Sequence, residues 1–119
     1  MRKIEQNMVK ALKGWQNWQC DNTRVKVFGN EGSRFVFLHN NRIVYIQNTS
    51  TGRLRFEFAT CGWVTRTTIS RLHTVASEFN LPVRFCIRNF ARVVYCNGEV
   101  VKDAPEPFVF ECEQWDVGE

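Results

Sequence analysis

The stretch RFVFLHNNRIVYIQNTSTGRLRFEF, residues 34–58, decides the fold class of this 119-residue chain. In its last part, 53–58, apolar and charged residues alternate strictly, which is the pattern of a half-buried antiparallel strand. Two further strand-like runs, 34–38 and 42–47, flank His39-Asn40-Asn41. Because asparagine tolerates a left-handed backbone, this spacing predicts a hairpin with a two-residue turn. Consecutive hairpins of this kind indicate an antiparallel sheet.

Working outward, similar strands are predicted at 23–28, 83–88, 92–96, 99–101 and 108–112. Asn97-Gly98 is a strong hairpin signal, and the last run suits an edge strand because two prolines precede it. Apolar residues at helical spacing predict one helix over 3–16, in which Gly14 weakens the last turn or ends the helix. A second helix is predicted from Thr67 or Thr68 to about Asn80. Residues 15–22 are expected to form a loop. The fold class is therefore α+β, with two helices packed on a mainly antiparallel sheet of about six to seven short strands.

The length of 119 residues is that of one domain, and we expect a single α+β domain over residues 1–119. No apolar run approaches the roughly 20 residues that cross a bilayer, so no membrane association is expected. Five dispersed cysteines without a C-x-x-C pair fit a reducing compartment, and we expect neither a metal nor a cofactor.

Charge divides the chain into two parts. The basic body, residues 1–98, holds 15 of the 16 Lys and Arg residues and 5 of the 12 acids. The acidic C-terminal segment, residues 99–119, holds one lysine against seven acids. This asymmetry bears on partners rather than on fold. The acidic segment weakens the case for nucleic-acid binding unless it folds away, and it could instead compete with nucleic acid for the basic surface.

The inventory of catalytic groups is poor. The five acids of the body are dispersed, and no phosphate-binding or zinc-protease motif is present. His39 and His73 could pair with a cysteine only if the fold brought them together, which leaves an enzyme as a third hypothesis. We therefore expect no catalytic residues and a binding protein.

Arginines at outward strand positions are the stronger signal, because guanidinium groups match phosphate and carboxylate. They would form one basic patch if their strands are adjacent. Tryptophans in loops or at chain ends, Trp18, Trp63 and Trp115, could stack on a base or anchor a protein interface. The predicted basic binding residues are Arg34, Arg42, Arg53, Arg55, Arg84, Arg88 and Arg92, and the predicted aromatic ones are Trp18 and Trp63.

An ordered series of short motifs resembles a family of small proteins encoded by bacteriophages and prophages. The motifs are KIEQ (3–6), NW (17–18), NT (22–23), LHNN (38–41), GW (62–63) and then Thr65, Thr67, Thr68 and SRL (70–72). They cover roughly the first two-thirds of the chain. The resemblance implies a phage protein that acts in the host bacterial cytoplasm.

Two functions are open at this point. The first is a non-enzymatic accessory protein that binds and inhibits a host protein or nucleoprotein complex, of which an anti-CRISPR inhibitor is one example. The second is a DNA- or RNA-binding protein that uses an arginine-rich sheet face. An unprotected final strand could also pair with a second copy, and the oligomeric state is left open.

Overall fold

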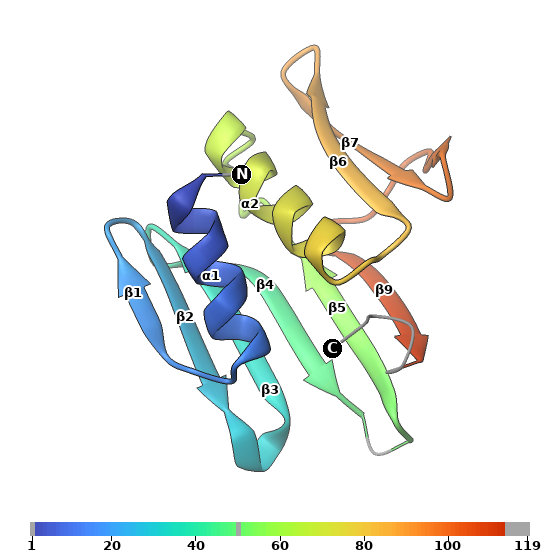
Figure 1. Cartoon of the computed structure of the whole chain (residues 1–119). Coiled ribbons are helices and arrows are strands. Elements are labelled where there is room, and N and C mark those ends of the chain that lie inside the picture. Colours follow the sequence, from blue (N-terminus) through green and yellow to red (C-terminus); the bar gives the residue numbers. More distant parts are fainter. Residues whose placement is uncertain (1, 50, 114–119) are drawn as a thin grey trace.

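Two helices lie on the same face of an antiparallel sheet in the computed structural model, which describes residues 2–49 and 51–113 (Figure 1). The helices are α1 (Lys3–Lys13) and α2 (Arg66–Glu78). The larger sheet has the strand order β1-β2-β3-β4-β5-β9. Its strands are β1 (Trp18–Cys20), β2 (Thr23–Phe28), β3 (Ser33–Leu38), β4 (Asn41–Asn48), β5 (Arg53–Phe58) and β9 (Phe108–Glu113).

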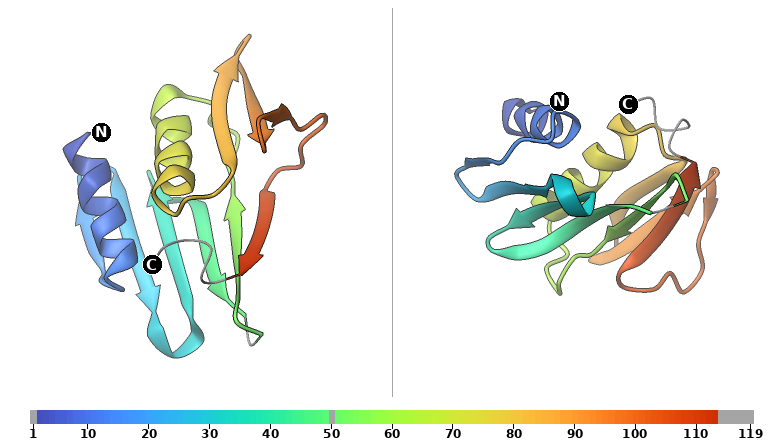
Figure 2. Two further views of the ribbon diagram at one scale, coloured as in Figure 1. Left: turned by 45° about the vertical axis from the view of Figure 1, so that its right-hand side comes forward. Right: turned by 90° about the horizontal axis from the view of Figure 1, so that it is seen from below.

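A smaller sheet, β6-β7-β8, projects beyond one end of the larger one (Figures 1 and 2). Its strands are β6 (Val83–Arg88), β7 (Ala91–Cys96) and β8 (Glu99–Val100). Phe85 joins the two sheets, because its ring lies 4.9 Å from that of Phe58 and 6.2 Å from that of Phe108, centroid to centroid. The α+β class is confirmed, whereas the single sheet is wrong, since the described residues form nine strands in two sheets.

Local backbone chemistry explains most element boundaries. The β3–β4 turn consists of His39 and Asn40, both with positive φ, so the predicted two-residue turn is confirmed one position earlier than its asparagine pair. The Asn97-Gly98 turn is confirmed as well. Helix α2 begins after Thr65, whose hydroxyl accepts a hydrogen bond from the Thr68 amide, so neither predicted cap was the right threonine.

Two features near the N-terminus differ from the predicted ranges. Helix α1 ends at Lys13 instead of residue 16, because Gly14 ends it, one of the two effects expected of this glycine, and Trp15 takes a positive φ. The segment expected to be a loop contains β1, a three-residue strand that pairs with β2. Trp18 belongs to this strand and packs against the core. A strand this short has too few residues to show an alternating pattern.

The core lies between the helices and the larger sheet. Met8 and Leu12 of α1, Leu72 of α2 and Phe56 of β5 are inaccessible to solvent. The inner face of the sheet is therefore filled, and the opposite face is left without a helix over it (Figure 2). Across the described residues, no helix is both long enough and apolar enough to cross a bilayer.

Candidate functional site

The uncovered face of the larger sheet carries a cluster of aromatic rings. Phe35 on β3 stacks on Tyr45 of β4 with 4.9 Å between ring centroids and an interplanar angle of 10°. Phe37 lies 6.2 Å from Phe35, and Phe28 meets Phe35 edge-on at 5.7 Å. Strand pairing places these side chains together, because Phe35 is the cross-strand partner of Tyr45 and Phe37 lies two residues further along β3, on the same face.

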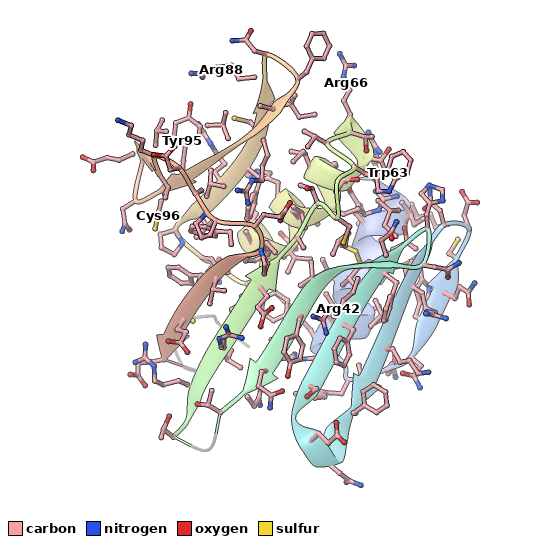
Figure 3. All side chains as sticks on the ribbon, turned by 180° about the vertical axis from the view of Figure 1, so that it is seen from behind. Arg42, Trp63, Arg66, Arg88, Tyr95 and Cys96 are labelled. Carbon is pink, nitrogen blue, oxygen red and sulfur yellow. The ribbon has the colours of Figure 1, made fainter. Side chains whose placement is uncertain are left out.

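Three cations lie over these rings. The Arg24 guanidinium is 4.6 Å from the Phe37 centroid, and that of Arg42 is 5.3 Å from the Tyr45 centroid. Lys26 lies 5.8 Å from the ring of Phe28. Strands β1 to β4 contribute no acidic residue to this half of the sheet. We call these residues the aromatic-basic face: Arg24, Lys26, Phe28, Phe35, Phe37, Arg42 and Tyr45 (Figure 3 labels Arg42).

The other half of the same face is neutralised by ion pairs. Arg53 contacts Glu113 of β9 at 2.6 Å, and Arg55 contacts Glu57. Arg55 also lies 4.0 Å from Glu111. Strand β9 thus brings the middle of the acidic segment against β5, as its pairing register requires. The positive charge of the face that is not ion-paired is therefore carried by β2 and β4.

The predicted basic residues are distributed over four environments. Arg42 lies on the aromatic-basic face, whereas Arg53 and Arg55 lie on the ion-paired half. The prediction that Arg34 lies on the surface is wrong, because this residue is completely buried on the helix side of β3. Its guanidinium donates to the Leu12 carbonyl at 3.0 Å and lies 4.2 Å from the Trp15 ring centroid.

The remaining predicted arginines belong to the smaller sheet, so the seven do not form one patch. Arg88 donates to the Tyr95 hydroxyl at 2.9 Å, and Arg84 lies 4.9 Å from the ring of Tyr95 (Figure 3). Arg92 donates to the carbonyls of Ala104 and Pro105. Its role in the described structure is to hold the segment that leads into β9.

The aromatic half of the site was missed from the sequence. In the run 34–38 every residue after Arg34 is apolar, so periodicity does not tell which alternate set faces outward. Phe35 and Phe37 were not recognised for that reason, and Phe28 and Tyr45, in the neighbouring runs, were not singled out either. A usable signal is the pair of flanking cations, since Arg24 and Lys26 on β2 are the cross-strand partners of Phe37 and Phe35.

The predicted aromatic residues lie elsewhere. Trp18 is partly buried in β1, whereas Trp63 is 62% exposed in the loop before α2. Trp63 lines a cavity of about 520 Å³ at the end of the larger sheet, together with His39 and the start of α2. Trp115 lies outside the described residues.

The histidines and cysteines show no prepared nucleophile. Burial and the charge of Arg84 lower the pKa of His73, although Glu5 opposes this shift. Burial and the carboxylate of Glu106 raise the pKa of the Cys61 thiol, which is the opposite of what a reactive cysteine requires. Among the described residues, no group of three or more His, Cys, Asp or Glu side chains is placed to hold a metal ion. That the chain is not an enzyme stays a prediction.

The comparisons with known proteins give one match. The family described as Kyanoviridae Gp96 protein matches residues 1–116. The chain belongs to this family. The prediction of a phage-encoded protein is thereby confirmed, and the match extends through most of the acidic segment, beyond the first two-thirds that the short motifs covered. No curated protein matches the chain, and no solved structure matches it either.

Proposed function

We propose that this phage protein binds single-stranded nucleic acid on the aromatic-basic face. The supporting observation is the combination of four stacked or edge-on rings with three cations on a sheet face that no described helix covers. Single strands are recognised by aromatic platforms on which bases stack and by positive charge that follows the phosphates. A flat sheet face offers both along neighbouring strands.

The rings are suited to stacking because they are partly accessible. Phe28 is 40% exposed, and the other three rings are half-buried against one another. Mutual packing fixes their orientation before a ligand arrives, which lowers the entropic cost of binding. The cations above the rings contribute phosphate contacts without a carboxylate partner on β1 to β4.

Fluorescence anisotropy with labelled single-stranded DNA and RNA tests this proposal. We expect F37A to weaken binding by about 5- to 100-fold, because one stacked base contributes about 1–3 kcal/mol. R42Q is expected to weaken binding and to reduce the salt slope, log Kd against log salt, by about 0.7. R53Q is the matched control, because Arg53 occupies the same sheet face within an ion pair.

Two results would sink the proposal. One is an absence of measurable binding at about 50 mM salt, where phosphate contacts are strongest. The other is equal loss of affinity in R42Q and R53Q, which would place the strand elsewhere on the sheet.

Inhibition of a host protein, including anti-CRISPR activity, is the second candidate, and the host cytoplasm is the expected site of action. One observation favours a protein partner. Phe90 is 96% exposed at the tip of the projecting β6–β7 hairpin, where its φ is 62°. A bulky residue at positive φ that packs against nothing in its own fold is suited to anchor a partner protein.

Capture from host lysate tests this role. The native chain should retain a stoichiometric host protein, and the F90N variant should lose it. Equal capture by both chains would contradict a role for Phe90.

A further inference from the structure

The cavity of about 520 Å³ beside Trp63 has the composition of a binding pocket for a neutral planar ring. It lies between the end of the larger sheet and the start of α2, and its volume falls within the range of about 300–1,000 Å³ of small-molecule sites. Leu38, Ile43 and Trp63 supply apolar walls, and His39, Asn41 and Thr67 supply polar groups. The described lining contains no aspartate, glutamate, lysine or arginine.

The three polar side chains are available to a ligand. In the part of the chain that the structure describes, those of His39, Asn41 and Thr67 form no hydrogen bond with another residue. The neighbouring Thr65 hydroxyl is occupied by contacts with Thr68, as the cap of α2. Imidazole, carboxamide and hydroxyl groups together offer both donors and acceptors, which is what the edge of a nucleobase requires.

The loop that carries Trp63 is held in place at several points. The Glu106 carboxylate accepts a hydrogen bond from the Thr60 amide at 3.0 Å, and Cys61 Sγ donates to the Arg42 carbonyl at 3.2 Å. The Trp63 amide donates to the Thr60 carbonyl at 2.9 Å. The indole is therefore presented at the cavity by an ordered backbone while most of its surface stays accessible, as a stacking residue requires.

The cavity adjoins the aromatic-basic face through β4. Asn41 and Ile43 line the cavity, and Arg42 between them points to the uncovered face, where it covers Tyr45. The register shift between Val36 and Phe37 in the β3–β4 pairing allows this arrangement. Figure 3 shows Arg42 on the uncovered face and Trp63 beyond the end of the sheet nearest to it. The cavity lies on the helix side of the sheet, so a strand bound on the uncovered face would reach it by passing around the sheet end at the β3–β4 turn, where His39 lines the cavity.

We infer that this cavity takes a single unstacked nucleobase, which stacks on Trp63 and is hydrogen-bonded by His39, Asn41 and Thr67. The inference rests on the proposed function, because it places the cavity at the end of the nucleic-acid path. The lack of charge in the lining favours a base over a phosphate. The aromatic-basic face would then hold the strand, and the cavity would add preference for one base.

The experiment follows the cavity directly by NMR of the ¹⁵N-labelled chain titrated separately with adenosine, guanosine, cytidine and uridine. Ribose 5-phosphate is the control without a base. We expect saturable shifts of the Trp63 indole N–H and of the amides 65–68 with at least one nucleoside and none with ribose 5-phosphate. W63A should remove the shifts of the amides 65–68, whereas W63F, which keeps an aromatic ring at this position, should retain them. T67V, which conserves side-chain volume, should weaken them.

Oligonucleotide binding by the same variants separates this inference from the proposed function. W63A is expected to raise the Kd for a single-stranded oligonucleotide about tenfold, equivalent to about 1.4 kcal/mol. If F37A loses binding and W63A does not, the proposal of binding on the aromatic-basic face is supported and the inference of a base pocket is overturned. If no oligonucleotide binds while a nucleoside still shifts the cavity, the proposed function fails and the pocket stands. An absence of saturable shifts with all four nucleosides overturns the pocket outright.

Discussion

Arg34 shows at the scale of one residue how a charge can be part of a core. It is completely buried, with its guanidinium between the rings of Trp15 and Phe79 at 4.2 and 5.5 Å. Its hydrogen bond to the Leu12 carbonyl satisfies an acceptor at the end of α1. Guanidinium suits this position because it is planar and more weakly hydrated than an ammonium group.

Replacing Arg34 by alanine should lower the free energy of unfolding by about 3 kcal/mol, since packing is lost and the Leu12 carbonyl loses its charged donor. R34K should also be destabilising, because lysine cannot reproduce the stacked planar contact. Urea denaturation measures both, with R42A as the surface control at about 0.5 kcal/mol or less. An R34A variant as stable as R42A would show that the buried guanidinium contributes nothing.

Arg34 also shows why part of the site could not be predicted from the sequence. Arg34 was placed outward because charged residues usually face water. Both alternate sets of the run 34–38 contain apolar residues, and only packing against α1 and α2 selects Val36 and Leu38 as the inner set. The outward set, Phe35 and Phe37, could therefore not be recognised as part of a binding face.

At the scale of elements, a buried ion pair joins the two helices. Glu5 of α1 accepts hydrogen bonds from Arg71 at 2.8 Å and from Ser70 at 2.6 Å, both on α2. Arg71 also donates to Thr23 of β2, at 3.2 Å. The pair is almost fully enclosed, with 4% of each side chain exposed, and it fixes the position of both helices relative to the sheet.

Loss of one partner should be costly because the other charge stays buried. We expect E5Q to lower the free energy of unfolding by about 3 kcal/mol at neutral pH. E78Q on α2 is the matched control, since Glu78 makes no ion pair with another described residue. A difference below about 0.5 kcal/mol between E5Q and E78Q would contradict a stabilising role for the pair.

The pH dependence of the free energy of unfolding follows from the same contacts of Glu5. Burial opposes ionisation of Glu5, but the hydrogen bonds from Ser70 and Arg71 outweigh it and hold the pKa below the ordinary 4.5. A lowered pKa in the folded state contributes stability above the unfolded value and loses it as pH falls through the folded value. Acid titration of unfolding should therefore show the gap between native chain and E5Q closing below about pH 4.5.

Elements with strong local signals were predicted well and those fixed by tertiary contacts were not. Strand 53–58 and the Asn97-Gly98 turn agree with the structure because alternation and turn chemistry act within a few residues. The division into two sheets depends on which strand becomes the neighbour of β5. Strand β9 takes that position, and its Phe108 pairs with Phe58, roughly 50 residues earlier in the sequence. Such a distant pairing leaves no local signal in the sequence.

At the scale of the whole molecule, the charge asymmetry of the sequence is partly cancelled in space. Glu111 and Glu113 on β9 meet Arg55 and Arg53, so the described part of the acidic segment lies on the β5 side of the open face. Strands β1 to β4 carry no acidic residue, and Glu57 of β5, the cross-strand partner of Tyr45, is ion-paired with Arg55. Competition between the tail and a ligand is thus limited, for the described residues, to one side of the sheet.

The double variant E111Q/E113Q should reveal whether a bound strand reaches that side. It releases Arg53 and Arg55 from their partners on β9 and adds two units of positive charge to the face. We expect affinity for single-stranded nucleic acid to rise by about threefold or more at 50 mM salt, with a smaller rise at 200 mM. Unchanged affinity at both salt concentrations would confine the strand to β2, β3 and β4.

The pairing of β5 with β9 also matters during synthesis of the chain. Strands β1 to β5 follow one another and can pair as they emerge from the ribosome, whereas β9 is synthesised last. Until then β5 is an unpaired edge, with Leu54, Phe56 and Phe58 on one side. Arg53 and Arg55 act in that interval as gatekeepers, since charge on an open strand discourages pairing with other nascent chains. The arginines that end in ion pairs thus protect the protein before those pairs exist.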